Sequence, residues 1–299
     1  MPGRNPSTLI IGAALALAAA APAANAQAPK PAPAKPGKAP AAAKPGKAPA
    51  PAPAKSKLDL PGLQKALESG DETKTLEALE TIAKSGDAAG APLVEGLLMR
   101  GASVTVLSRA IETLGILAQP SSGGALSPYA QHRTAELRRG ALRALIASKS
   151  PIAGDVLRKA LHGSDPAARS IAARGLGELN VRAAVPELLR VLPKDVAEAA
   201  QSLGVLCVGP ECEKFIGLLG KLSFEVMESG MVPLLLRPQA EVTDELKIKL
   251  IERLRRMATQ PANQLLQTAL SKFPPDGSAA VKKALERALK GFSVAEEAP

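Results

Sequence analysis

The sequence predicts an all-α fold: an α-solenoid of about seven to eight helical hairpins over residues 58–299. Apolar residues in this region recur at spacings of three and four, which is typical of amphipathic helices. Related segments also recur at intervals of about 30 residues, the length of one helical hairpin. The clearest hairpin covers residues 165–192, DPAARSIAARGLGELNVRAAVPELLRVL.

The first helix of this hairpin is expected over residues 165–179. Asp165 is a favourable N-cap, and Pro166 occupies the first helical position, where a missing N–H costs nothing. Gly175 and Gly177 each cost about 1 kcal/mol relative to Ala in an isolated helix, so we expect a neighbouring helix to pack closely against them. Asn180 tolerates the left-handed conformation that ends a helix. The apolar stripe consists of Ile171, Ala172, Leu176 and Leu179.

The second helix is expected over residues 182–192. Pro186 lies in its first turn, and Pro193 stops it. Its apolar stripe consists of Val185, Leu188, Leu189 and Leu192. One hairpin cannot bury two such stripes alone, so neighbouring hairpins are required.

Neighbouring hairpins are visible as internal repeats. Residues 169–176 align with residues 138–145 when shifted back by 31 positions, and residues 176–179 align with residues 114–117 when shifted by 62. Leu203-Gly204 aligns with Leu176-Gly177 at a shift of 27. Helix pairs repeated at this interval predict a solenoid in which each hairpin packs against the next.

The repeat resembles a known family. The central hairpin is similar to the short HEAT-like repeat named after the phycobilisome lyases. The residues that carry the similarity are Asp165-Pro166, Arg169, Ala172-Ala173, Leu176-Gly177 and the run 184–189 (AVPELL). The resemblance implies structural roles for Asp165, Arg169, Leu176 and Gly177, and it implies a HEAT-like solenoid. Lyase activity does not follow from it, because a fold does not determine a function.

The remaining elements are assigned from the same pattern. Residues 121–133 are a poor helix start, and a charged helix over 243–258 stands between the sixth hairpin and the closing pair. The expected helices are 60–69 with 71–84, 88–99 with 103–118, 134–148 alone, 151–162 with 165–179, 182–192 with 195–207, 210–220 with 223–236, 243–258, and 262–272 with 278–291.

The first 57 residues are expected to lie outside the solenoid. Residues 1–26 have one early positive charge, Arg4, an apolar run over 9–21 and an A-x-A cleavage site at 24–26, as in a secretory signal peptide cleaved before Gln27. An uncleaved anchor is the alternative, although the run is short for a membrane span of about 20 residues. We therefore expect a periplasmic or secreted protein with no transmembrane span after cleavage.

Residues 27–57 are almost wholly Pro, Ala, Lys and Gly, which predicts a disordered linker. Arg4 and the seven linker lysines account for most of the net charge of +10, leaving +2 for residues 58–299. Specific nucleic-acid binding by the solenoid is therefore not expected. The lysines suit a solvated spacer, which we favour, or attachment to an anionic envelope surface. If the N-terminus is not a signal, the same segment would be a cytoplasmic nucleic-acid-binding tail.

The sequence contains no recognisable catalytic or cofactor motif. His132 and His162 lie beside no carboxylate cluster, no His-Glu dipeptide occurs, and neither a Walker A nor a G-x-S-x-G motif is present. We therefore expect no enzymatic activity, no cofactor and no metal.

Cys207 and Cys212 flank a predicted turn, and the sequence leaves open a structural disulfide, two buried thiols or a redox pair.

Arginines recur at equivalent positions of successive repeats: Arg138, Arg139 and Arg143, then Arg169 and Arg174. For Arg138 and Arg169 we favour a structural ladder, with Arg169 paired to Asp165. For Arg139, Arg143 and Arg174 we expect contact with solvent or with a protein partner.

Four large apolar residues are interpreted as core residues where the repeat is irregular: Phe215, Phe224, Met227 and Met231. The favoured function is an exported, non-enzymatic protein-binding scaffold of the bacterial envelope; the alternative is an accessory subunit of an enzyme.

Overall fold

The computed structural model describes residues 58–296, with side chains up to Lys290. The predicted signal peptide, 1–26, and linker, 27–57, lie outside the described residues. The described residues form the helices α1–α15 and one isolated β-bridge, between Leu219 and Leu222. The α-helices are α1 (Leu60–Glu68), α2 (Glu72–Ser85), α3 (Ala91–Arg100), α4 (Val104–Leu117), α5 (Gly123–Leu126), α6 (Ala135–Ser148), α7 (Ala153–Ala160), α8 (Pro166–Glu178), α9 (Val185–Val191), α10 (Ala197–Leu206), α11 (Pro210–Gly217), α12 (Phe224–Leu236), α13 (Asp244–Met257), α14 (Gln260–Ser271) and α15 (Ala279–Glu296).

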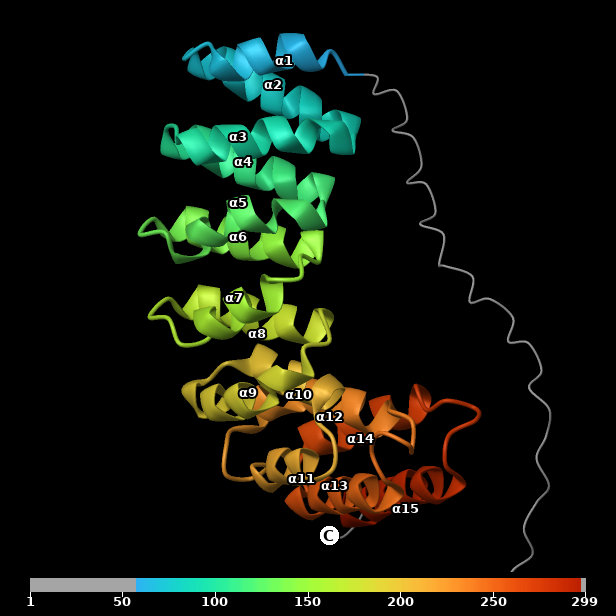
Figure 1. The fold of residues 1–299 in the computed structure, drawn as a ribbon. Helices are drawn as coiled ribbons and strands as arrows, with labels where there is room; N and C mark the ends of the chain where they lie inside the picture. Colours follow the sequence, from blue (N-terminus) through green and yellow to red (C-terminus); the bar gives the residue numbers. More distant parts are fainter. Residues whose placement is uncertain (1–57, 297–299) are drawn as a thin grey trace, which may run out of the picture. The chain divides into compact units, whose positions relative to one another are not determined.

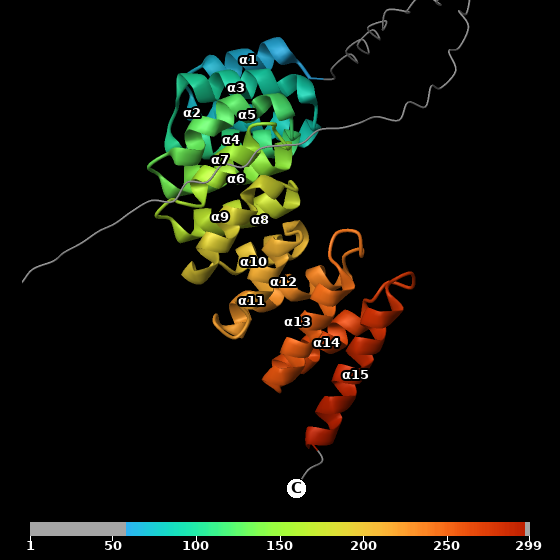
Figure 2. The same ribbon diagram turned by 60° about the horizontal axis from the view of Figure 1, so that its bottom comes forward.

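The helices stack as hairpins in two layers (Figures 1 and 2). The second helices of the hairpins, α2, α4, α6, α8, α10, α12 and α14, pack one against the next. The first helices make a second series, in which α1 packs on α3, α3 on α5, α9 on α11 and α11 on α13. This arrangement confirms the predicted all-α solenoid.

Local sequence sets the helix ends as predicted for the central hairpin. The Asp165 carboxylate accepts hydrogen bonds from the backbone N–H groups of Ala167 at 3.1 Å and Ala168 at 3.3 Å, so it caps α8. Asn180 has a φ of 54° just after α8. The third hairpin is irregular as expected. Its first half consists of 3-10 turns at 120–122 and 127–131 around the short α5.

The pairing at the C-terminal end differs from the prediction. We expected residues 243–258 to stand alone and residues 262–272 to pair with 278–291. In the structure α13 forms a hairpin with α14, and α15 packs on both of them. The apolar residues of α13 that require this cover are Leu246, Leu250, Ile251 and Leu254. Val281 and Leu285 of α15 are buried in return, so α15 closes the array.

A continuous apolar core runs through the stack, and small residues let the second helices approach closely. A Cβ atom added at Gly204 of α10 would lie 2.9 Å from the Cα atom of Gly230 in α12, and closer still to its carbonyl oxygen. A Cβ atom at Gly177 would overlap the side chain of Ser202, as the sequence predicted for this glycine. Phe215, Met227 and Met231 are fully buried, in agreement with their interpretation as core residues.

Candidate partner-binding surface

The exposed side of the second helices carries two rows of residues at equivalent positions of α4, α6, α8, α10 and α12. One row is Glu112, Arg143, Arg174, Gln201 and Val232; the other is Ile116, Ala147, Glu178, Val205 and Leu236. All ten are exposed or half-exposed. We call these two rows the second-helix face. Neighbouring helices pack about 8–10 Å apart, so each row places one side chain at every such step.

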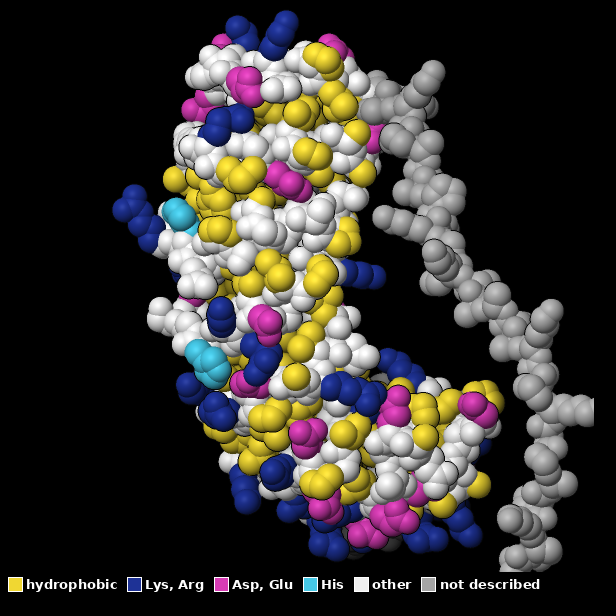
Figure 3. Space-filling model, in the orientation of Figure 1, with side chains coloured by type: hydrophobic (Ala, Val, Ile, Leu, Met, Phe, Trp, Pro, Cys, Tyr) yellow, Lys and Arg dark blue, Asp and Glu magenta, His cyan; other side chains and the backbone are white. Residues whose placement is uncertain are grey.

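Large apolar side chains are part of this face. Ile116 is 53% exposed and Val205 is 43% exposed, whereas most leucines and isoleucines of the solenoid are buried. Figure 3 shows one side of the molecule, on which hydrophobic side chains lie exposed between charged side chains of both signs. Contiguous apolar surface rimmed by polar groups is typical of protein-binding sites, so Ile116 matters chiefly as part of the groove beside it.

A groove of about 470 Å³ lies on this face between α4 and α6. Its floor is made of small residues, which leave room above the two helices: Gly115, Gly140, Ala144 and Ala147. Ile116 borders the groove as an exposed apolar side chain, and the buried Ile111 lies beneath it. The polar lining consists of Ser108, Glu112, Glu136 and Arg143.

A second groove, of about 550 Å³, lies between α12 and α14. Val232, Pro233 and Leu236 of α12 line it together with Leu265 of α14. Pro233 has no N–H, so it gives no hydrogen bond to the carbonyl group one turn earlier in α12. Glu228 lines the groove near the start of α12, and Lys272 lines it at the end of α14.

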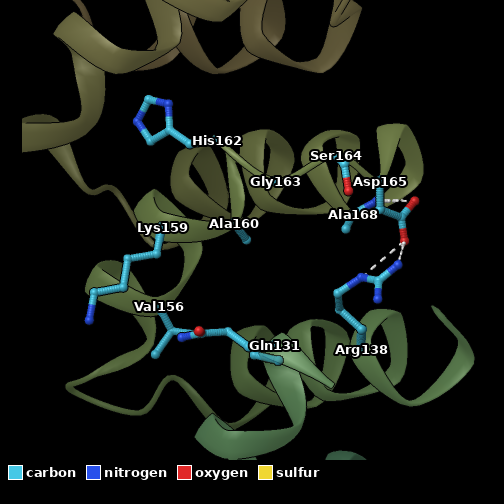
Figure 4. A pocket seen from close by; sticks show the side chains of 11 residues that line it. Gln131, Arg138, Val156, Lys159, Ala160, His162, Gly163, Ser164, Asp165 and Ala168 are labelled. Atoms are coloured by element: carbon cyan, nitrogen blue, oxygen red, sulfur yellow. Dashed lines mark hydrogen bonds and ion pairs between the residues drawn. The ribbon is translucent and has the colours of Figure 1, made fainter. Parts of the chain in front are cut away.

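Arg139, expected to face solvent or a partner, is instead paired with Asp165, although its side chain is still 38% exposed. Its Nε and Nη2 atoms donate to the Asp165 carboxylate at 3.0 and 2.8 Å, and Arg138 donates to the same carboxylate at 2.6 and 3.2 Å (Figure 4 shows the Arg138 pair). The Asp165 side chain is only 5% exposed. The hydrogen bonds from Arg139, followed by those from Arg138, hold the pKa of this carboxyl group well below its usual range.

Asp165 therefore has two roles, because the carboxylate that caps α8 also binds α6 of the preceding hairpin. Arg138 additionally donates to the carbonyl group of His132 at 2.7 Å, so it fixes the turn before α6. Arg169 differs from the expectation: it donates to the carbonyl oxygen of Gly163 at 3.0 Å and does not bind Asp165. Leu176 is fully buried, as its role in the repeat requires.

Arg143 and Arg174 lie on the second-helix face as expected. The Arg174 side chain is 59% exposed, and its Nη2 atom is 3.5 Å from Glu198 of α10, a weak surface contact. Arg143 is exposed and forms no ion pair within the described residues. On the second-helix face, the charge of Arg143 is therefore fully available for a partner, and that of Arg174 is only weakly engaged.

A second partly buried ion pair between hairpins was also not anticipated from the sequence. Arg158 of α7 donates to Glu187 of α9 at 2.6 and 3.2 Å, and the Glu187 side chain is 15% exposed. The two residues are 29 positions apart, close to one repeat, as are Arg138 and Asp165. A search for opposite charges about one repeat apart would have found both pairs.

The two cysteines form a disulfide bond between Cys207 and Cys212, at the turn between α10 and α11, and both residues are fully buried. Arg237 at the end of α12 donates to the carbonyl oxygen of Cys207 and to Glu241. The disulfide therefore belongs to a buried corner where α10, α11 and α12 meet.

The two histidines occupy hairpin ends. The ring of His132 stacks on Tyr129, and its Nδ1 atom accepts from the backbone N–H of Thr134. His162 and Lys159 border an edge cavity of about 450 Å³, with the Arg138–Asp165 pair on its other side (Figure 4). Within residues 58–290, no three His, Cys, Asp or Glu residues are grouped as a metal ion would require. None of the described helices is both long and apolar enough to cross a membrane.

Comparison with known proteins identifies the repeats. The family model for HEAT repeats matches residues 123–204, from α5 to α10, which confirms the resemblance inferred from the central hairpin. No curated protein sequence matches the chain. Among solved structures, the chain is similar to the CpcE–CpcF complex of phycocyanin lyase from Nostoc, with 15% identity and a TM-score of 0.44 over 79% of this chain and 96% of that chain.

Two further solved structures show the same kind of similarity. Human deoxyhypusine hydroxylase has 14% identity and a TM-score of 0.37, over 79% of this chain and 96% of that chain. A designed armadillo repeat protein has 18% identity and a TM-score of 0.36, over 78% of this chain and 100% of that chain.

Proposed function

We propose that this HEAT-like repeat protein is a non-enzymatic protein-binding scaffold that works in the bacterial cell envelope after export. The second-helix face carries the proposal. It combines exposed aliphatic side chains, two grooves and an arginine without an ion pair, a combination suited to partner binding. Repeat solenoids present extended surfaces of this kind to their partners.

A scaffold without catalysis fits the way the buried charges are used. The Asp165 carboxylate, the charged group with the most strongly lowered pKa, is occupied by two guanidinium groups and two backbone N–H groups. Glu187 is similarly occupied by Arg158. These groups join adjacent hairpins, so their perturbed pKa values have a structural cause.

Export is supported by the sequence of residues 1–26 and by the cysteines. A disulfide bond such as Cys207–Cys212 is typical of oxidising compartments. N-terminal sequencing of the protein from cells that produce it tests this part of the proposal. We expect the mature chain to begin at Gln27; an intact Met1 in the cytosolic fraction would contradict export.

Partner binding is tested by photo-crosslinking from two matched positions. One photo-reactive amino acid replaces Gln201, an exposed residue on the second-helix face, and in a separate variant it replaces Arg190, exposed on the first helix α9. We expect a discrete crosslinked protein from position 201 and little or none from position 190. Equal crosslinking from both positions, or none from 201, would contradict a specific binding face.

A further inference from the structure

The α4–α6 groove has the shape and charge order of a helix-binding site. We propose that it binds an amphipathic helix of a partner protein, lying antiparallel to α4 and α6. This inference rests on the proposed scaffold function and names the partner element and its orientation. It depends on the form of the groove, on the exposure of Ile116 and on the charges at the two ends of the groove.

The form of the groove suits a helix. The groove follows two neighbouring second helices, α4 and α6, that pack side by side. A Cβ atom at Gly115 would already lie 3.4 Å from Ala144, so the floor is tightly closed and apolar. Side chains three and four positions apart on an incoming helix form one stripe, which fits the length of such a groove. Ile116, 53% exposed at one wall, gains cover when the stripe enters.

The two ends of the groove differ in the charge left over for a ligand: Glu136 lies at one end, whereas Arg143 lies at the other end beside Glu112, whose charge is paired with Arg109. Glu136 lies in the first turn of α6, and Arg143 lies seven residues later. Seven residues of helix span about 10.5 Å, or two turns. Glu136 accepts a hydrogen bond from Ser108 at 2.6 Å, and Glu112 pairs with Arg109 at 2.9 Å. Arg143 forms no ion pair within the described residues, so it is the charge most available to a ligand.

These charges select an orientation. Acidic residues stabilise the first turn of a helix, and basic residues stabilise the last turns. A partner helix with an acidic residue in its first turn and a basic residue two turns later can place the acid beside Arg143 and the base beside Glu136. That placement makes it antiparallel to α6. The α12–α14 groove has the same order of charges, with Glu228 near the start of α12 and Lys272 at the end of α14.

The test uses the full chain and a defined probe. The probe is a fluorescent, alanine-based helical peptide of about 16 residues that carries one glutamate, leucines three and four positions later, and a lysine seven positions after the glutamate. Binding is measured by fluorescence anisotropy at low salt. Three control peptides reverse the order of the two charges, replace the glutamate by lysine, or place a proline at the centre.

We expect the probe to bind the wild-type chain and the proline peptide to bind at least about tenfold more weakly. The reversed peptide can meet the same two charges only by lying parallel to α6, with its own charges opposed to its helix dipole, so it should bind a few-fold more weakly than the probe. Arg143→Glu should weaken binding of the probe by about tenfold or more, and the peptide with lysine in place of glutamate should recover binding to this variant. Ile116→Ser should weaken binding similarly. Circular dichroism should show the same helicity for both variants, because both side chains are exposed.

Matched substitutions separate the groove from general surface effects. Arg255→Glu changes an exposed arginine of α13, and Ile152→Ser removes an exposed isoleucine before α7; both should leave binding within about twofold. Absence of probe binding, or equal binding by wild type and Arg143→Glu, would overturn the inference. The scaffold proposal would survive that result if the crosslink from position 201 persists, so the two failures are distinguishable.

Discussion

The Asp165 carboxylate joins two hairpins, and replacing it with asparagine is expected to destabilise the solenoid strongly. Asparagine keeps the shape and can still cap α8, so Asp165→Asn removes mainly the charge and one acceptor. Hydrogen bonds to charged groups each contribute about 1.5–3 kcal/mol, and removing one partner of a buried ion pair costs about 3–5 kcal/mol. Arg138 and Arg139 are 23% and 38% exposed, so water compensates them in part.

We therefore expect a loss of about 2–3 kcal/mol in the free energy of unfolding, which corresponds to a fall in Tm of about 5–10 °C for a chain of this size. Circular dichroism during heating and urea unfolding measures both quantities at pH 7. The matched control is Asp155→Asn, which removes a carboxylate that is 80% exposed and 3.6 Å from Arg158. This control should cost less than about 0.5 kcal/mol.

The pH dependence gives an independent check of the same carboxylate. The pKa of Asp165 is lowered in the folded state, chiefly by the hydrogen bonds from Arg139. Its contribution is fully present above the unfolded pKa of about 3.9 and is lost as the pH falls below that value. The stability difference between wild type and Asp165→Asn should therefore shrink below about pH 4. A difference equal to that of Asp155→Asn at pH 7, or one that stays constant to pH 3, would refute the reasoning.

Three further predictions concern packing, the disulfide and a buried lysine. Gly204→Ala should destabilise the chain by about 1–3 kcal/mol, because the added Cβ atom would overlap the backbone of α12. Gly96→Ala should instead raise stability by up to about 1 kcal/mol, because the nearest side-chain atom lies 3.5 Å from the added Cβ atom. Urea unfolding measures the stability of both variants. Replacing Cys207 and Cys212 by serine should cost about 2 kcal/mol by urea unfolding, and alkylation of the denatured wild type should modify both thiols only after reduction. Burial lowers the pKa of Lys247 in the folded state. The stability of the wild type should therefore increase as the pH rises from the folded-state pKa towards the higher pKa of the unfolded state. Lys247→Met should lack this increase when urea unfolding is measured as a function of pH.

The fold could be predicted because its determinants are local and repeated. Asp165, Pro166 and Asn180 mark helix ends through backbone preferences that act within a few residues, and the structure has helix ends at these positions. Gly177 indicated a close helix contact because a glycine inside a helix needs compensation from packing, and Ser202 occupies the space where its Cβ atom would lie.

The features that sequence reasoning missed depend on contacts between hairpins. Arg139 was assigned to solvent or a partner because its acceptor, Asp165, lies 26 positions away in the next hairpin. The pairing of α13 with α14 was missed because residues 243–291 depart from the 31-residue pattern. The grooves depend on which small residues face each other across two helices, as Gly115 faces Ala144, and the repeat interval alone does not specify that register.

The most direct test of a partner-binding second-helix face is charge reversal along it. In a chain that carries the photo-reactive residue at position 201, Arg143→Glu and Arg174→Glu are introduced together, and the yield of the crosslinked partner is measured beside the far-ultraviolet circular dichroism spectrum. Both guanidinium groups project from exposed positions, so the helical signal should be unchanged while the crosslink falls by about tenfold or more. An unchanged crosslink would contradict a partner-binding role for these arginines. A loss of helical signal would show instead that these arginines hold the hairpins together.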